Sequence, residues 1–186
     1  MNLPNRLTIL RICFVPVFVI LMAAGPSFRF WAFLVFVIAG LTDLLDGRIA
    51  RARNLVTDFG KIMDPLADKI LVLAAMVCLC ERGEVPGWTI IIVLFREFLV
   101  SGMRIVAAAK GNVIAAGVSG KIKTTLQIIS LIMLLLTGVP FLSVPFGSQA
   151  FRILAMAVYY ASVAMAVYSG ADYVIRNKSV FLSKGI

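Results

Sequence analysis

Residues 43–68 read DLLDGRIARARNLVTDFGKIMDPLAD, and this stretch carries five of the nine acidic residues of the 186-residue chain. Long apolar segments precede and follow it. Acidic side chains in or at the ends of membrane spans are costly to bury and are usually functional. The stretch therefore predicts two membrane helices with a charged site where they meet.

The composition excludes an ordinary water-soluble domain. Apolar residues make up 61% of the chain, and the mean hydropathy is +1.01, which is typical of an integral membrane protein. Lys and Arg number 18 against nine Asp and Glu, a balance that suits the anionic inner face of a membrane. No nucleic-acid partner is expected.

Six apolar stretches approach the roughly 20 residues that a helix needs to cross a bilayer. They cover residues 7–24, 30–51, 63–80, 87–109, 120–138 and 151–175. Gly, Pro and charged residues separate them, and the connections leave no room for a soluble domain. We expect an all-α integral membrane protein of six transmembrane helices that forms one domain over residues 1–186.

The cations predict the orientation in the membrane. Fifteen of the 18 fall at the N-terminus, the second-to-third and fourth-to-fifth junctions or the tail, and the others are Arg29, Arg82 and Arg152. The positive-inside rule then places both termini and the charged site on the cytoplasmic side of the cytoplasmic (inner) membrane. A cleaved signal peptide is the competing interpretation of the basic, apolar N-terminus, but Arg11 interrupts the apolar run.

The chain contains no histidine, which removes the commonest general base and transition-metal ligand. Cys13, Cys78 and Cys80 lie in apolar runs without metal-site spacing, so we expect buried thiols. Proton chemistry must then fall to carboxylates, and a bound metal must be a hard, oxygen-liganded ion.

The acids are spaced for such a metal. Asp43 and Asp46 are three residues apart and Asp64 and Asp68 four apart, so each pair shares one face of a helix. Four carboxylates repel one another unless cations lie between them, and two Mg²⁺ or Mn²⁺ ions are the natural occupants. The alternative is a loop in which these acids merely pair with nearby arginines.

The pattern Asp43-x2-Asp46-Gly47-x2-Ala50-Arg51-x8-Gly60-x3-Asp64-x3-Asp68 resembles the signature of the CDP-alcohol phosphotransferase family at every defined position. The resemblance implies a six-helix membrane enzyme, usually a homodimer, that joins a CDP-linked group to an alcohol and releases CMP. It implies four metal-site acids, Asp43, Asp46, Asp64 and Asp68, with Asp68 also the general base. Contacts to the CDP moiety are implied for Gly47, Ala50 and Arg51.

Other residues are candidates for the same CDP-lipid site. Gly60 allows a close approach of ligand to backbone or shapes the turn. Asn5 and Thr8 share a helical face and can donate to a nucleotide or phosphate, or they cap the first helix. Asp58 is expected to cap the third span.

Residues 2–11, 95–104 and 120–127 resemble the bacterial phosphatidylglycerophosphate synthases within this family. This resemblance implies that CDP-diacylglycerol and sn-glycerol 3-phosphate are converted to phosphatidylglycerophosphate and CMP. A dianionic acceptor needs a cationic pocket, for which the candidates are Arg96, Arg104, Lys121 and Lys123. Alternatively, these cations anchor the helices or contact lipid headgroups. Glu97 either orients Arg96 or neutralises it.

Three rival functions remain open at this point. Another acceptor, such as phosphatidylglycerol, inositol phosphate or serine, would keep the acidic site and change the cationic one. A cation transporter would use the acids as an ion pathway, although no matching acidic cluster lies near the opposite surface. The third rival is a catalytically inactive scaffold.

Overall fold

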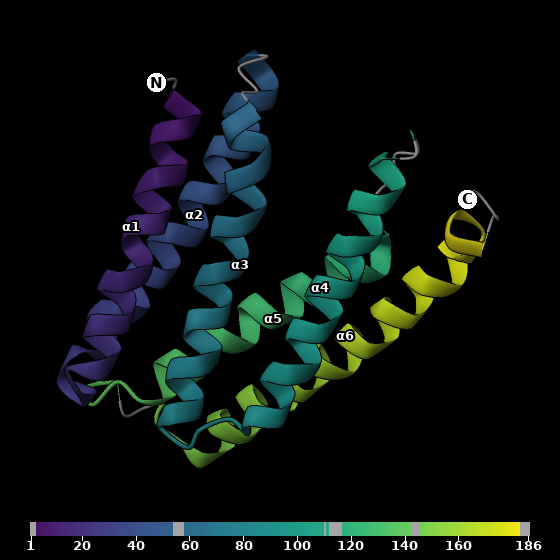
Figure 1. Cartoon of the computed structure of the whole chain (residues 1–186). Helices are drawn as coiled ribbons and strands as arrows, with labels where there is room; N and C mark the ends of the chain where they lie inside the picture. The colour runs from purple at the N-terminus through teal and green to yellow at the C-terminus, as the bar shows by residue number, and fades with distance from the viewer. Residues whose placement is uncertain (1–2, 54–57, 110, 112–116, 143–145, 183–186) are drawn as a thin grey trace. The chain divides into compact units, whose positions relative to one another are not determined.

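The fold is that of a computed structural model, which describes the backbone of residues 3–53, 58–109, 111, 117–142 and 146–182 (Figure 1). Side chains are described for residues 9–42, 69–109, 111, 117–142 and 146–178. Over these ranges the chain is helical and contains no strand. The all-α prediction is confirmed.

Each predicted apolar stretch corresponds to one long helix. The helices are α1 (Leu3–Ala23), α2 (Arg29–Arg53), α3 (Asp58–Glu81), α4 (Gly87–Ala109), α5 (Val118–Thr137) and α6 (Gln149–Leu182), and the short helix η1 (Pro26–Phe28) precedes α2. Helices α3 and α6 extend further than their apolar stretches. Both extensions contain Lys or Arg, which are good helix formers although their hydropathy is low, so hydropathy underestimates helix length.

Two helices of the described part meet the length and composition of a membrane span, over Val118–Thr137 and Gln149–Lys178. Shorter apolar helices cover Ile9–Ala23 and Pro26–Thr42. Six spans and the orientation of the termini stay predictions.

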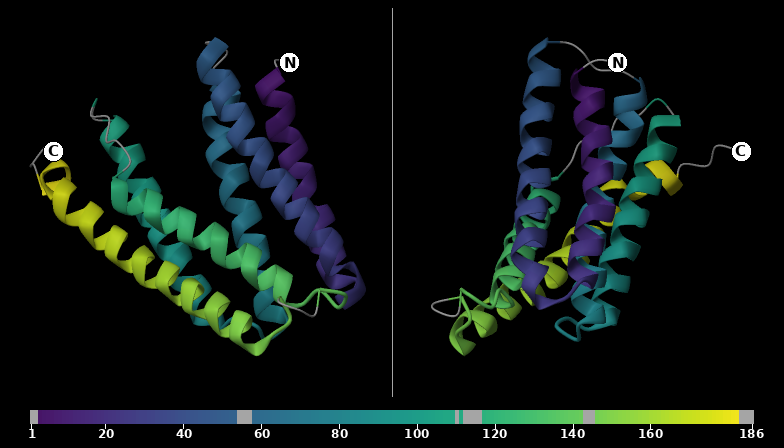
Figure 2. Two further views of the ribbon diagram at one scale, coloured as in Figure 1. Left: turned by 180° about the vertical axis from the view of Figure 1, so that it is seen from behind. Right: turned by 90° about the vertical axis from the view of Figure 1, so that its left-hand side faces the viewer.

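The chain divides into two compact units. The first unit comprises Met1–Val85 and Leu131–Arg152. In it α1 packs against both α2 and α3, as the two views of Figure 2 also show. Phe18 of α1 and Phe36 of α2 are 0% and 3% exposed, and their ring centroids lie 5.9 Å apart. The core of this unit therefore includes a buried aromatic contact between α1 and α2.

Arg29 ties three parts of the first unit together. It is 2% exposed, and it donates from Nε to the Leu135 carbonyl at 2.9 Å and from Nη2 to the Leu134 carbonyl at 2.6 Å. Both guanidinium ends also pair with the Glu84 carboxylate. A Cβ at position 138 would collide with this guanidinium. Glycine at position 138 thus makes room for an arginine that binds carbonyls in the last turn of α5.

The second unit comprises Pro86–Ser130 and Ile153–Ile186. Its interior contains Val93, Val100, Tyr159 and Val163, all 5% exposed or less. The buried Thr89 and Tyr159 hydroxyls share a hydrogen bond of 2.6 Å between α4 and α6. This contact satisfies two buried polar groups at one end of the unit.

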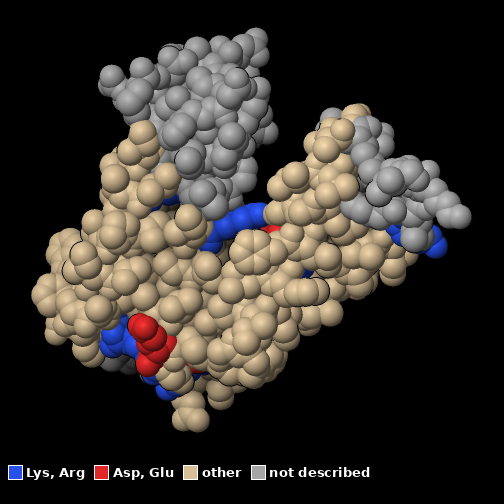
Figure 3. Space-filling view, in the orientation of Figure 1, with Lys and Arg blue, Asp and Glu red and all other residues tan. Residues whose placement is uncertain are grey.

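The outward faces are strongly apolar. On α4, the side chains of Ile91, Phe95, Phe98 and Ile105 are each about 70% exposed. On the face drawn in Figure 3, Lys, Arg, Asp and Glu occupy only small areas of the described surface. Such a surface suits a hydrocarbon environment better than water.

The same property corrects one prediction about the cysteines. Cys78 is buried and Cys80 partly buried, but Cys13 is exposed. An apolar sequence context means burial in a water-soluble protein, whereas in a membrane helix it is compatible with exposure to lipid. The expected burial of the Cys13 thiol is therefore wrong.

Candidate functional site

The acidic signature lies on two helices of the first unit. Residues 43–53 belong to the C-terminal part of α2 and residues 58–68 to the N-terminal part of α3. The side chains of Asp43, Asp46, Asp64 and Asp68 lie outside those that the structure describes. Because both segments are helical, the intervals of three and four residues do place each pair of positions on one side of its helix.

The donor chemistry of this signature suits a hard divalent metal. All four candidate ligands are carboxylates, the ligands that Mg²⁺ and Mn²⁺ prefer. Among the side chains that the structure describes, no group of three or more His, Cys, Asp or Glu could hold a metal. The four signature acids are not among these described side chains, so the metal site stays a prediction.

For the candidate CDP-lipid residues, too, the structure describes the backbone but not the side chains. Asn5 and Thr8 lie in the first turns of α1, and Gly60 lies near the start of α3. The others, Gly47, Ala50 and Arg51, are in the last turns of α2. Asp58 is the first residue of α3, the end of the helix at which its capping role was expected.

A cavity of about 240 Å³ lies within the second unit. It is lined by Arg96, Arg104, Gly117, Ser119, Gly120, Ser169, Asp172, Tyr173, Arg176 and Asn177. Three arginines thus face one carboxylate. Gly117 precedes α5 and residues 118–120 are in its first turn, and a helix N-terminus adds positive potential. The cavity is smaller than the roughly 300–1,000 Å³ of drug-sized sites, so it suits a small anion.

Arg96 is held in place from several directions. Its Nε donates to Ser169 Oγ at 3.0 Å and its Nη1 to Glu97 Oε1 at 2.7 Å. Glycines on the two neighbouring helices leave room for it. A Cβ at Gly170 would lie 3.2 Å from Arg96 Cγ, and one at Gly120 3.0 Å from Nη2. The guanidinium is therefore fixed at the cavity wall.

A second set of contacts surrounds Asp172. This carboxylate accepts from Ser119 Oγ at 2.9 Å and from Arg176 Nε at 2.5 Å. Beside it, the guanidinium carbon of Arg104 lies 5.6 Å from the centroid of the Tyr173 ring, a cation–π distance. The cavity thus contains an acid that holds Arg176 and Ser119 in place, while Tyr173 holds Arg104.

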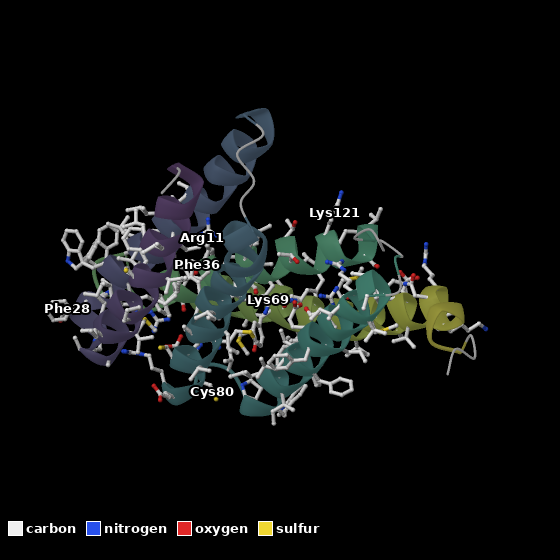
Figure 4. All side chains as sticks on the ribbon, turned by 45° about the horizontal axis from the view of Figure 1, so that its top comes forward. Arg11, Phe28, Phe36, Lys69, Cys80 and Lys121 are labelled. Atoms are coloured by element: carbon white, nitrogen blue, oxygen red, sulfur yellow. The ribbon has the colours of Figure 1, made fainter. Side chains whose placement is uncertain are left out.

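The structure separates the four predicted acceptor cations. Arg96 and Arg104 line the cavity. Lys121 is exposed on α5 and points away from the helices in Figure 4. Lys123 is 4% exposed and donates to Glu97 Oε1 at 2.8 Å. The two arginines are therefore brought together at one site, whereas the two lysines occupy different surroundings.

Sequence reasoning missed Asp172, Arg176 and Ser119 as cavity residues. Asp172 is the one acid after Glu97, and an acid in an apolar helix is itself a signal of function. Arg176 was counted only among the cytoplasmic cations of the tail. The two positions are four residues apart on α6, so the ion pair itself could be predicted from the spacing.

Comparison with known proteins defines the class. The sequence profile of the CDP-alcohol phosphatidyltransferase family matches residues 1–168, and the chain belongs to this family. The expected family is thereby confirmed, and membership favours an enzyme over the transporter and scaffold interpretations.

Curated relatives narrow the comparison. The chain is 42% identical over 191 residues to the CDP-diacylglycerol–glycerol-3-phosphate 3-phosphatidyltransferase of Bacillus subtilis, with 95% of each chain covered. It is 43% identical over 136 residues to the enzyme of that name from Rickettsia bellii, with 73% of this chain and 75% of the relative covered. A probable phosphatidylglycerophosphate synthase of Mycobacterium tuberculosis is 35% identical over 179 residues, with 94% and 81% covered.

Proposed function

We propose that the chain is a phosphatidyltransferase that converts CDP-diacylglycerol and sn-glycerol 3-phosphate to phosphatidylglycerophosphate and CMP. The activity is the one named for the relatives from Bacillus subtilis and Rickettsia bellii. The observation that carries the choice of acceptor is the small cavity in which Arg96, Arg104 and Arg176 face the single acid Asp172.

The cavity residues suit the phosphate of the acceptor. Arginine offers a planar fork of donors that matches phosphate oxygens, and the N-terminus of α5 adds backbone N–H groups. Arg104 and Arg176 approach the phosphate beside Arg96. A neutral amino acid such as serine gains less from three arginines, so a phosphorylated acceptor is favoured.

The acidic signature serves the CDP-lipid. Asp43, Asp46, Asp64 and Asp68 hold two Mg²⁺ or Mn²⁺ ions, which supply charge neutralisation at the pyrophosphate when bound. The remaining CDP-lipid contacts come from Asn5, Thr8, Gly47, Ala50, Arg51 and Gly60. The acyl chains stay in the bilayer.

The chemistry is a displacement at phosphorus. Asp68 accepts the proton of the glycerol 1-hydroxyl, and the oxygen then forms a bond to the β-phosphorus. The bond from that phosphorus to the oxygen bridging it to the α-phosphate breaks, and CMP leaves with this oxygen. A carboxylate is the available base because the chain contains no histidine.

We further propose that the enzyme is a homodimer in the cytoplasmic membrane. Six helices cross the bilayer, with both termini and the charged site on the cytoplasmic side. The distribution of the cations supports this orientation. The dimer rests on the resemblance to the family.

The test is release of CMP by the purified protein supplied with CDP-diacylglycerol, Mg²⁺ and one acceptor at a time. The acceptors are glycerol 3-phosphate, inositol phosphate, phosphatidylglycerol and serine. Of these four acceptors, we expect only glycerol 3-phosphate to give CMP release. Chelation of the metal should abolish this release. Release with serine instead would contradict the role of the cavity.

A further inference from the structure

Glu97 makes a contact that the reaction scheme leaves unexplained. Its Oε1 accepts hydrogen bonds from Arg96 Nη1 on its own helix and from Lys123 Nζ on α5. Consecutive residues of a helix point in different directions. The pair therefore forms because the Arg96 side chain bends back toward α5 rather than because helix geometry imposes it.

The bend directs Arg96 along the cavity. Its Nε is held by Ser169 on α6, and its Nη2 lies beside Gly120 at the start of α5. Glu97 and Ser169 use the Nη1 and Nε donors, which leaves the Nη2 end directed at the part of the wall formed by the α5 N-terminus. The guanidinium thus has one orientation, set by partners on both sides.

The burial of the charged groups around Glu97 also indicates a role for this residue. Lys123, Arg96 and Glu97 are 4%, 11% and 19% exposed. Burial disfavours a charged ammonium unless an anion compensates it. The Glu97 carboxylate compensates Lys123 and Arg96 together, so it couples the buried lysine to the arginine that lines the cavity.

We propose that Glu97 is a positioning residue of the acceptor site. Its carboxylate fixes the Arg96 guanidinium in the orientation that meets the phosphate, and Lys123 acts on the acceptor through Glu97 rather than by contact. This inference rests on the proposed function, because it takes the acceptor phosphate as the ligand of the cavity. Two possible roles of Glu97 would change the affinity for the acceptor in opposite directions. An acid that only neutralises the cavity weakens binding of a dianion, whereas a positioning acid strengthens it.

The test compares wild type with Glu97→Gln, which keeps the size of the side chain and removes its charge. CMP release is measured with glycerol 3-phosphate varied at saturating CDP-diacylglycerol, and then with the lipid varied. We expect the KM for glycerol 3-phosphate to rise about tenfold, the loss of one charge-assisted hydrogen bond. Both kcat and the KM for the lipid should stay within about twofold.

Glu81→Gln is the matched control, because it removes one acid from an exposed position at the end of α3. It should resemble wild type in both constants. An unchanged or lower KM for glycerol 3-phosphate in Glu97→Gln would overturn the positioning role. Equal losses toward both substrates would also overturn it, because they indicate a general disturbance of structure.

The Glu97→Gln variant could fail to fold if Lys123 cannot be buried without Glu97. A second pair of variants tests the proposal in that case. Lys123→Gln and the double variant Glu97→Gln/Lys123→Gln both avoid a buried lysine without its anion. The positioning role predicts a higher KM for glycerol 3-phosphate in the double variant than in Lys123→Gln, and equal values overturn it. Failure of the wild-type enzyme to release CMP with glycerol 3-phosphate would instead contradict the proposed function, and this inference with it.

Discussion

Arg104 is the cavity residue whose effect on the acceptor is easiest to isolate. It is exposed at the cavity and stacks on Tyr173, so its loss removes a proposed phosphate partner with little effect on packing. Arg104→Gln should raise the KM for glycerol 3-phosphate by about ten- to a hundredfold, since hydrogen bonds to charged groups contribute about 1.5–3 kcal/mol. Steady-state CMP release measures this effect.

Lys178→Gln is the control for Arg104→Gln. It removes an exposed cation of the same unit, at a position outside the residues that line the cavity. Its KM for glycerol 3-phosphate should change less than about twofold. Equal changes in the two variants would mean that the acceptor responds to net charge rather than to the cavity.

The four acids of the signature are expected to divide between binding and proton transfer. Asp68→Asn removes the proposed base, so turnover should be abolished while binding of CDP-diacylglycerol remains largely intact. Asp46→Asn removes a proposed metal ligand and should weaken both turnover and binding. Equilibrium binding of the CDP-lipid, measured beside CMP release, separates the two roles. Equal losses of binding in the two variants would contradict this division.

At the scale of single residues, the sequence was most informative where spacing carries the chemistry. The intervals of the acidic signature led to the family that the sequence profile matches. Asp172 and Ser119 could not be found in this way. Their contact joins α5 to α6 across 53 residues, and no local pattern encodes a pairing of that length.

At the scale of helices, the Arg29 cluster predicts a large effect on stability. Removing one partner of a buried ion pair costs about 3–5 kcal/mol, and the lower end of this range applies because Arg82 Nε still lies 3.7 Å from Glu84 Oε1. Arg29→Met should therefore lower the unfolding temperature of the detergent-solubilised protein by roughly 10 °C. The loss of hydrogen bonds to the Leu134 and Leu135 carbonyls acts in the same direction.

Arg152→Met provides the comparison within the same unit. Arg152 is exposed, and surface substitutions usually change stability by no more than about 0.5 kcal/mol. Thermal unfolding of both variants should separate them clearly. Similar unfolding temperatures would show that the Arg29 cluster does not stabilise the first unit.

Helix positions were well predicted because Gly, Pro and charged residues interrupt an apolar chain at nearly every connection. The break at Gly25 and Pro26 corresponds to the short helix η1, and the charged run from Glu81 to Glu84 to the turn after α3. Helix ends were less accurate. The polar last turns of α6 continue the helix through Arg176 and Asn177, where the decline in hydropathy had suggested an end.

At the scale of the whole molecule, the proposed orientation predicts which loops are reachable from each side. The test uses a background in which Cys13, Cys78 and Cys80 are replaced, so that each added cysteine is unique. In intact cells, a maleimide that cannot cross the membrane should label Gly147→Cys before α6. It should label Lys178→Cys only after the membrane is opened. The reverse pattern would contradict cytoplasmic termini.

The division into two compact units was not predictable from the sequence. Residues 131–152 belong to the first unit although residues before and after them belong to the second. Apolar periodicity shows that a helix has a buried face without showing which helix covers it. In a membrane protein both lipid and protein neighbours are apolar. A difference in hydropathy between the faces of a helix therefore does not show which face packs against another helix.

In the proposed reaction, glycerol 3-phosphate itself becomes part of the lipid product. The most direct measurement supplies the purified protein with CDP-diacylglycerol, Mg²⁺ and glycerol 3-phosphate labelled in its carbons, and follows the label and CMP together. We predict that label enters an anionic, organic-soluble lipid in equal amount to the CMP released, and that chelation of the metal stops both. Release of CMP without label in the lipid would show that another hydroxyl, such as water, is the acceptor and would contradict the account.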